Sequence, residues 1–412
     1  MDLPGKIGRY QILGLVARGG MAEILRAKSI GLAGFEKLVA VKRIAPAQAR
    51  EPRFVRSFID EARIAAQLSH RHIVPVFDFG AEGDELYLVM ELVDGHDLRA
   101  IIDRARAAGT VMPPPLVCHV VAAVAAGLAH AHQQADGHGR PLRIVHCDVS
   151  PANVMVSAEG EVKILDFGVA RASFGHAVER RRLRGKPRYM APEQTRGETP
   201  TAATDVFALA TVAWELATGR PLFDCPDIPT TLAAVRTQPV PAFAEAGVPA
   251  PLAATLDEAL ARAPADRPSA QAIALAAATA AAGAGARALA AWLDELVRPD
   301  AAAAAAAPTS AGTLDTVDQP IPRPTSLVTT TRQRAHRGFP VLAEATDVTT
   351  APVAGGDFDD DATRAEAVDV AWLDDDPEVQ AAAARLLAPG VERRDRQAGD
   401  DTQPPPTTRS PS

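Results

Sequence analysis

Three polar side chains border one expected β-hairpin and could together do chemistry. Two short apolar runs at residues 154–156 and 162–165 flank a polar turn, a pattern typical of a hairpin. Asp148 and Asn153 precede the first run, and Asp166 follows the second. A carboxylate and an amide oxygen at one hairpin mouth suit a hard cation such as Mg²⁺. The remaining carboxylate could orient or deprotonate a hydroxyl nucleophile.

The spacing of these residues forms three motifs in a fixed order. They are H-x-D-x-x-x-x-N from His146 to Asn153, D-F-G at 166–168 and A-P-E at 191–193. Any one of them alone could be ordinary turn-capping Asp and Asn residues, but the order of all three favours a joint function. The sequence therefore resembles the protein kinases, specifically the bacterial relatives of the eukaryotic Ser/Thr kinases.

The resemblance implies an α+β, bilobal protein-kinase fold with a β-rich small lobe, a helical large lobe and a disordered C-terminal tail. We expect the chain to divide into a kinase domain at 10–280 (small lobe 10–93, large lobe 94–280), a helical extension at 281–298 and a disordered tail at 299–412 that is rich in Ala, Pro, Thr and Asp.

Charge and cysteine content narrow the class of protein. The formal net charge of −8 argues against a nucleic-acid partner, which would require a clustered basic surface. Beyond Arg298 there are 19 Asp and Glu residues against 10 Arg, so the tail is the acidic part. The three cysteines lack metal-ligand spacing, and the first residues lack an apolar signal core. We therefore expect a soluble, cytoplasmic protein with reduced thiols and no membrane anchor.

A glycine turn follows the first expected strand, Tyr10–Ala17. In kinases such a turn places backbone N–H groups over the phosphates of ATP. Gly19 matches the second glycine of the family pattern and Gly20 follows it, whereas Ala17 and Ala22 replace the first and third glycines. A Gly-Gly hairpin that binds nothing remains the alternative interpretation of this stretch.

A lysine and a glutamate occupy apolar surroundings in the next two expected elements. Lys42 lies in the middle of the strand Leu38–Ile44, and Glu61 lies within the apolar stripe of a helix. A buried carboxylate is costly without a cation, so Lys42 is its expected partner. The resemblance implies the same pair, with Lys42 holding the α- and β-phosphates. The stripe consists of Phe54, Phe58, Glu61, Ala65 and Leu68.

The resemblance also implies how the nucleotide base is held. Met90 corresponds to the residue behind the adenine, the backbones of Glu91 and Val93 would bond its edge, and Asp97 would approach the ribose. Asp97 could equally be the N-cap of the following helix. The other expected contacts are Val16, Ile24 and Ala40.

The resemblance assigns the catalytic roles residue by residue. Asp148 would orient the substrate hydroxyl and accept its proton, while Asn153 and Asp166 would hold Mg²⁺. Lys42, paired with Glu61, would steady the phosphates of ATP. Outside the site, Glu193 and Arg267 resemble the ion pair that ties the activation segment to the large lobe, and Asp205 resembles the residue that binds the catalytic-loop backbone.

Three departures from the family pattern bear on regulation and specificity. Cys147 stands where an Arg usually receives the activation-loop phosphate. Ser150 replaces a Lys that usually contacts the γ-phosphate, and Lys186 replaces a Thr that usually bonds the catalytic Asp. The segment from Gly168 to Glu193 contains one Ser, Ser173, and no Thr. We therefore expect activity that does not require activation-loop phosphorylation.

Three interpretations of function follow. The leading one is a soluble signalling kinase that transfers the γ-phosphate of Mg-ATP to Ser/Thr hydroxyls of proteins, including its own tail. The first alternative is a nucleotide-binding pseudokinase scaffold, favoured by the altered glycine turn, Ser150 and Lys186. The second is a small-molecule kinase, disfavoured by the activation segment and A-P-E motif. The segment Ala365–Ala388 is a candidate partner-binding motif, with chance in an Ala-rich chain as its alternative.

Overall fold

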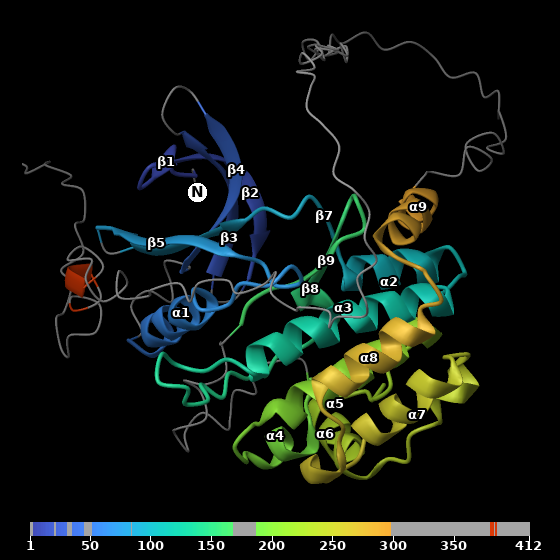
Figure 1. The fold of residues 1–412 in the computed structure, drawn as a ribbon. Helices are drawn as coiled ribbons and strands as arrows, with labels where there is room; N and C mark the ends of the chain where they lie inside the picture. Colours follow the sequence, from blue (N-terminus) through green and yellow to red (C-terminus); the bar gives the residue numbers. More distant parts are fainter. Residues whose placement is uncertain are drawn as a thin grey trace, which may run out of the picture. The chain divides into compact units, whose positions relative to one another are not determined.

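The N-terminal part of the chain folds as an antiparallel sheet with one helix packed against it (Figure 1). The strand order is β1-β2-β3-β4-β6-β5. β4 carries β-branched and apolar residues that suit a buried central strand, and its last six residues are buried. The strands are β1 (Lys6–Ile7), β2 (Tyr10–Arg18), β3 (Ala22–Ile30), β4 (Glu36–Ile44), β5 (Val76–Glu82) and β6 (Glu85–Glu91).

Helix α1 (Pro52–Ala65) packs on one face of this sheet. It begins at Pro52, whose fixed φ suits the first turn of a helix. Phe58 of α1 lies against Phe79 of β5, with ring centroids 5.9 Å apart, and Val55 is fully buried beside them. Each such buried side chain contributes about 1.5–3 kcal/mol of transfer free energy. The small-lobe core therefore holds α1 against the strand that carries Lys42.

The large lobe is helical and is organised around α3 (Pro114–His132). α3 is long and apolar enough to cross a membrane, but 67% of its most apolar window is buried in the protein. It is thus the core helix against which α5 and α8 pack. The other helices are α2 (Leu98–Ala107), α4 (Pro192–Arg196), α5 (Ala202–Thr218), α6 (Ile228–Thr237), α7 (Ala250–Ala259), α8 (Ala270–Ala280) and α9 (Ala286–Val297).

A small second sheet lies between the two lobes, in the order β7-β8-β9 (Figure 1). Val154 pairs with Ile164 in an antiparallel register, which confirms the expected hairpin. Because antiparallel strands start and end at the same edge, Asn153 and Asp166 leave the hairpin side by side. The strands are β7 (Gly95–Asp97), β8 (Val154–Ser157) and β9 (Val162–Ile164).

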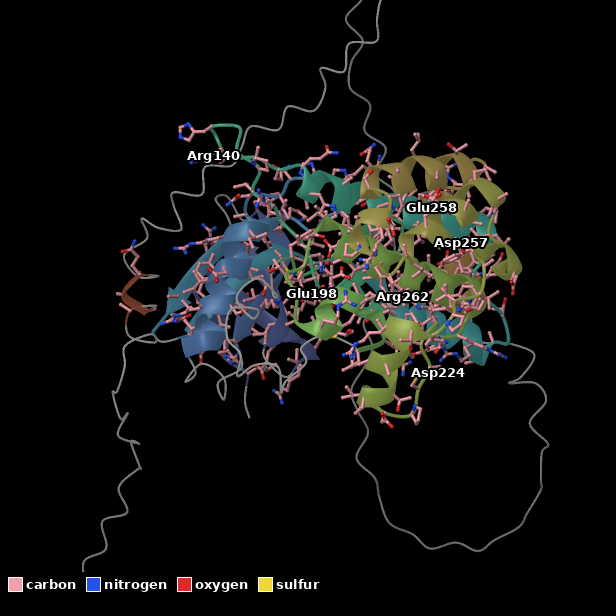
Figure 2. All side chains as sticks on the ribbon, turned by 90° about the horizontal axis from the view of Figure 1, so that it is seen from below. Arg140, Glu198, Asp224, Asp257, Glu258 and Arg262 are labelled. Atoms are coloured by element: carbon pink, nitrogen blue, oxygen red, sulfur yellow. The ribbon has the colours of Figure 1, made fainter. Side chains whose placement is uncertain are left out.

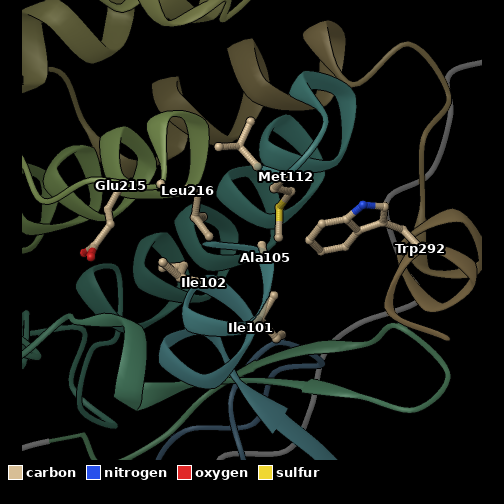
Figure 3. Close-up of a pocket in the computed structure, with 9 residues that line it drawn as sticks. Ile101, Ile102, Ala105, Met112, Glu215, Leu216 and Trp292 are labelled. Carbon is tan, nitrogen blue, oxygen red and sulfur yellow. The ribbon is translucent and has the colours of Figure 1, made fainter. Parts of the chain in front are cut away.

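The hairpin turn packs on α9, which follows the last core helix. Gly160 has φ +82°, and a Cβ there would lie 1.9 Å from the carbonyl oxygen of Ala286, so the contact requires glycine. Leu289 and Leu293 of α9 are buried, and Trp292 lines a pocket beside α2 (Figure 3). α9 therefore packs the turn of the hairpin against the large lobe.

A computed structural model describes residues 3–19, 22–30, 35–44, 52–83, 85–167, 187–297, 380–382 and 384, with the side chains of 52–54 left out. All of them belong to one compact unit. Charged side chains such as Arg140, Glu198 and Asp224 cover the outside of the large lobe (Figure 2). Gly20, Ser173, Lys186 and nearly all of the predicted disordered tail at 299–412 lie outside the described residues.

Candidate active site

Asp148 and Asn153 form the catalytic-loop side of the site. A short turn, Pro151–Asn153, folds the loop back on itself. The Asn153 amide Nδ2 donates to the Asp148 carbonyl oxygen at 2.7 Å and to its Oδ2 at 2.9 Å. Because the amide nitrogen is committed to Asp148, the amide oxygen is the atom left to bind a cation. The two residues are thus oriented by one another.

Asp205 of α5 fixes the backbone of this loop from below. Its fully buried carboxylate accepts N–H bonds from His146 and Cys147, each at 2.8 Å, which confirms the role expected for it. Cys147 has φ +65°, a left-handed conformation that L-residues rarely adopt. The Asp205 bonds hold the loop in this conformation, which turns the adjacent Asp148 toward the hairpin.

Two further side chains support the loop and were missed from the sequence. His132, at the end of α3, places Nε2 2.8 Å from Asp205 Oδ2. The Gln194 amide donates to the Cys147 carbonyl at 2.9 Å. Gln194 directly follows the A-P-E motif, which is a local signal that could have drawn attention to it. His132 carries no such signal, because only the tertiary fold brings α3 and α5 together.

Lys42 joins the small lobe to the hairpin. Its Nζ lies 2.5 Å from Glu61 Oε1 and 2.8 Å from Asp166 Oδ1, so one ammonium bridges two carboxylates. Both Lys42 and Glu61 are only 5% exposed, whereas the Asp166 side chain is 30% exposed. Asp166 also has φ +58°, a strained turn that directs its carboxylate across the cleft.

The electrostatics of this triad follow from its burial. Desolvation disfavours the Lys42 ammonium, but the carboxylates of Asp166 and Glu61 outweigh it, so the pKa of Lys42 is raised. Burial raises the pKa of Glu61 above its ordinary value, and the nearby Lys42 ammonium opposes that rise. Lys42 is therefore positively charged at neutral pH, and its ammonium lies between the carboxylates of Glu61 and Asp166.

An apolar cluster borders the triad and contains most of the residues expected around the adenine. Ala40 and Met90 are buried, and Ile24, Val93 and Leu165 pack against them. The Glu91 N–H donates to the Pro75 carbonyl at 3.1 Å, so the Glu91 backbone group that could bond the base is its carbonyl. Apolar side chains next to a cation suit an aromatic base joined to phosphates.

Three other expected nucleotide contacts are not members of this apolar cluster. Val16 is 54% exposed and lies at a register shift between Leu15 and Ala17 in the β2–β3 pairing. The Gly19 N–H closes the turn onto the Ala22 carbonyl at 2.9 Å. Asp97 accepts the Ala100 N–H at 2.7 Å, so it is the N-cap of α2, the alternative role that the sequence offered for it. Contact of any of these residues with ATP stays a prediction.

The Glu193–Arg267 ion pair is present and almost fully buried, as expected. The guanidinium donates to both Glu193 oxygens at 2.8 Å, and Thr204 Oγ1 donates to the same carboxylate at 2.8 Å. Burial raises the pKa of Glu193, but the hydrogen bonds and the charge of Arg267, together with hydrogen bonds from the backbone and Thr204, outweigh it and leave that pKa below its ordinary value. The pair anchors the A-P-E motif to the large lobe.

Because the pKa of Glu193 is lowered, we expect the stability of the fold to decrease in acid. A carboxyl group with a depressed folded-state pKa stabilises the fold above its unfolded pKa, and loses that contribution as pH falls through the folded pKa. We expect the free energy of unfolding, measured in urea between pH 7 and pH 3, to fall less steeply in Glu193→Gln than in the wild type. Parallel curves for the two proteins would contradict this assignment.

A second buried network at the end of the activation segment was also missed from the sequence. The Tyr189 hydroxyl donates to Glu215 Oε2 at 2.5 Å, and Arg99 of α2 donates to both Glu215 oxygens at 2.8 and 3.1 Å. Glu215 is fully buried in α5. The network ties Tyr189 to the centre of the large lobe. Glu215 also lines the pocket beside Trp292, which contains none of the predicted site residues (Figure 3).

Comparison with known families agrees with this geometry. The model of the protein kinase domain matches residues 10–276. The chain belongs to the protein kinase family. This kinase domain is similar to several bacterial kinases. It is 40% identical over 213 residues to the tyrosine-protein kinase MasK of Myxococcus xanthus. It is 36% identical over 218 residues to the serine/threonine-protein kinase PrkC of Bacillus subtilis, and 38% identical over 269 residues to the serine/threonine-protein kinase PknB of Mycobacterium tuberculosis.

The likeness covers the kinase domain and not the whole of these relatives. The matches span 51%, 53% and 63% of this chain but only 33%, 31% and 40% of MasK, PrkC and PknB. Among solved structures, the kinase domain of Mycobacterium tuberculosis PknI superposes with a TM-score of 0.52 at 31% identity, covering 69% of this chain and all of that one. The fold is accordingly the bilobal kinase fold that the sequence predicted.

The family implies ATP and Mg²⁺, and the donor atoms present fit both. The hairpin mouth offers a carboxylate, Asp166, and an amide oxygen, Asn153, which are the hard oxygen ligands that Mg²⁺ prefers. The Leu165 N–H donates to the Asn153 carbonyl at 2.9 Å, so the two ligand residues lie on adjoining backbone. Lys42 supplies a fixed positive charge for phosphates beside the apolar cluster.

Proposed function

We propose that this chain transfers the γ-phosphate of Mg-ATP to Ser and Thr hydroxyls of proteins. The observation that carries the proposal is the bridge formed by Lys42 between Glu61 and Asp166, opposite the paired Asp148 and Asn153. Phosphoryl transfer needs little covalent help from an enzyme, because positioning and charge neutralisation provide most of the rate enhancement. The site contains the residues that these two tasks require.

Each residue has a task that follows from its surroundings. Asp148 would orient the substrate hydroxyl and accept its proton, since Asn153 and the rigid loop fix its carboxylate. Lys42 would bind phosphate oxygens without titrating. Asn153 and Asp166 would hold Mg²⁺, which supplies charge neutralisation at the phosphates when it is bound. The A-P-E anchor and the Tyr189 network would provide a rigid platform for a protein substrate.

The acceptor residue is the finer part of the proposal. PrkC and PknB are named as serine/threonine kinases, and MasK is named as a tyrosine kinase. The relatives therefore support both Ser/Thr and Tyr as acceptors. Ser150 is fully buried where Ser/Thr kinases usually present a Lys. Tyrosine phosphorylation is therefore the second candidate. The tail, with Thr329–Thr331, offers acceptors of the first type.

Phosphosite mapping tests the acceptor. The full chain is incubated with Mg-ATP and a generic acceptor protein, and the modified residues are identified by peptide mass spectrometry. We expect phosphoserine and phosphothreonine in both proteins. Phosphate found on tyrosine alone would reject the Ser/Thr assignment and support the second candidate.

Because Cys147 replaces the Arg that usually receives the activation-loop phosphate, we expect activity that does not depend on a phosphorylated activation segment. A thiol cannot form the charge-assisted hydrogen bonds with which an Arg at this position holds a phosphate. The Gln194 and Asp205 bonds already fix the Cys147 backbone without such a phosphate. We expect phosphatase-treated wild type and Ser173→Ala to keep kcat within about a factor of two, a free-energy difference well below 1.4 kcal/mol.

A kinase assay on the dephosphorylated proteins measures this. The matched control is Ser269→Ala, a Ser that caps α8 far along the chain from the activation segment. If phosphatase treatment and Ser173→Ala each abolished activity while Ser269→Ala did not, the activation segment would need its phosphate and the proposal would be wrong.

A further inference from the structure

A short stretch near the C-terminus has the pattern of an amphipathic helix. Apolar residues recur at steps of three and four, which places them on one helical face. The stretch is preceded by Asp376-Pro377-Glu378, a helix-start signal with acidic residues in the first turn, and is followed by Pro389-Gly390, a stop signal. The apolar positions are Val379, Ala382, Ala383, Leu386 and Leu387.

The structure places part of this stretch against the small lobe. Residues 380–382 and 384 are helical. Ala382 is completely buried, whereas Gln380, Ala381 and Ala384 are exposed. Burial of one position among exposed neighbours is what a helix shows when it lies with one face on another surface. Ala382 follows Val379 by three residues and precedes Leu386 by four, so in a helix it falls on the same face as these two larger apolar residues.

Ala382 belongs to the hydrophobic cluster between α1 and the sheet. We call five apolar residues of this cluster the α1 surface: Ile44 of β4, Val55, Phe58 and Ala62 of α1, and Phe79 of β5. Phe58 precedes Glu61 by three residues and Ala62 follows it directly, so whatever packs on the α1 surface contacts the helix turn that carries Glu61. α1 also exposes Arg56 and Arg63, opposite in charge to the acidic start of the stretch.

We propose that residues 376–388 form an amphipathic helix that binds the α1 surface of the same chain and holds α1 in the position that pairs Glu61 with Lys42. The occupant is the chain's own tail, because Ala382 is already seated in the cluster. Residues 298–379 provide ample length to reach from α9 to the small lobe, at roughly 3.3 Å per extended residue. This inference concerns a docking surface and does not depend on which hydroxyl is phosphorylated.

Hydrogen–deuterium exchange on the full-length chain tests the docking. Ala382→Glu puts a carboxylate into the apolar contact, while Ala381→Glu adds the same charge at the neighbouring exposed position and serves as the matched control. We expect exchange of α1 amides at 55–65 to rise about tenfold in Ala382→Glu, equivalent to about 1.4 kcal/mol of lost protection, and to stay at the wild-type value in Ala381→Glu. Equal exchange in the two variants would overturn the proposal.

Further measurements distinguish undocking of the tail from destabilisation of the whole domain and from docking on a second copy. Peptides from α3 and α5 should exchange at the wild-type rate in Ala382→Glu, and the milder Ala382→Ser should lie between the wild type and Ala382→Glu. A synthetic peptide of residues 372–390, added to the Ala382→Glu chain, should restore α1 protection, and the same peptide carrying Ala382→Glu should not. Protection of wild-type α1 that rises with protein concentration would place the tail on a second copy and overturn docking within one chain.

Discussion

Replacing Asp148 with Asn is expected to lower kcat about 10²–10⁴-fold while leaving the affinity for Mg-ATP nearly unchanged. The substitution keeps the shape of the side chain and the hydrogen bonds that orient the loop, but removes the group that accepts the hydroxyl proton. Steady-state phosphate transfer gives kcat, and calorimetric titration of the same protein with Mg-ATP gives the Kd.

The control for this substitution is Glu258→Gln, which neutralises one exposed carboxylate on α7 of the large lobe (Figure 2). It should leave both kcat and Kd at the wild-type values. If Asp148→Asn weakened Mg-ATP binding by the same factor as it lowered kcat, Asp148 would act in nucleotide binding and its assignment as the proton acceptor would fail.

Replacing Arg267 with Met is expected to lower the free energy of unfolding by about 3–5 kcal/mol. The Arg267 side chain is fully buried and donates to Glu193 through two bonds. Removing it leaves the Glu193 carboxylate buried without its cation, which costs far more than loss of an exposed pair. Urea unfolding followed by circular dichroism measures the difference.

The matched control is Arg196→Met, three residues after Glu193, which breaks the exposed pair between Arg196 and Glu198. Exposed pairs are screened by water, so little change is expected. The double variant Arg267→Met/Glu193→Gln should be less destabilised than the two single changes added together, because the second change removes the stranded charge. Strict additivity would show that the two residues act independently.

The sequence was sufficient to predict the hairpin and the residues at its mouth. Two short apolar runs around a polar turn indicated β8 and β9, and the fixed spacing of three motifs placed Asp148, Asn153 and Asp166 around them. The Lys42–Glu61 contact could be predicted because a buried carboxylate needs a cation. Asp205 and the Glu193–Arg267 pair followed from motif positions, whose roles the family resemblance supplied.

Contacts without a local pattern could not be predicted. Glu215 meets Tyr189 and Arg99 from 26 and 116 residues away, and nothing in the neighbourhood of either partner indicates the meeting. The register shift between Leu15 and Ala17, where Val16 lies, could not be predicted, because a one-residue slip is invisible to alternation alone. Ala382 could not be singled out, because an alanine stripe in an Ala-rich chain has little contrast with its surroundings.

Phosphoryl transfer by this chain is read from the intact mass of the purified full chain after incubation with Mg-ATP. We expect the wild type to gain one or more phosphoryl groups with time, and a variant carrying Lys42→Met and Asp148→Asn to gain none under the same conditions. A wild type that binds Mg-ATP yet transfers no phosphate to itself or to any acceptor protein would not be a kinase in solution, and a nucleotide-binding scaffold would be its better description.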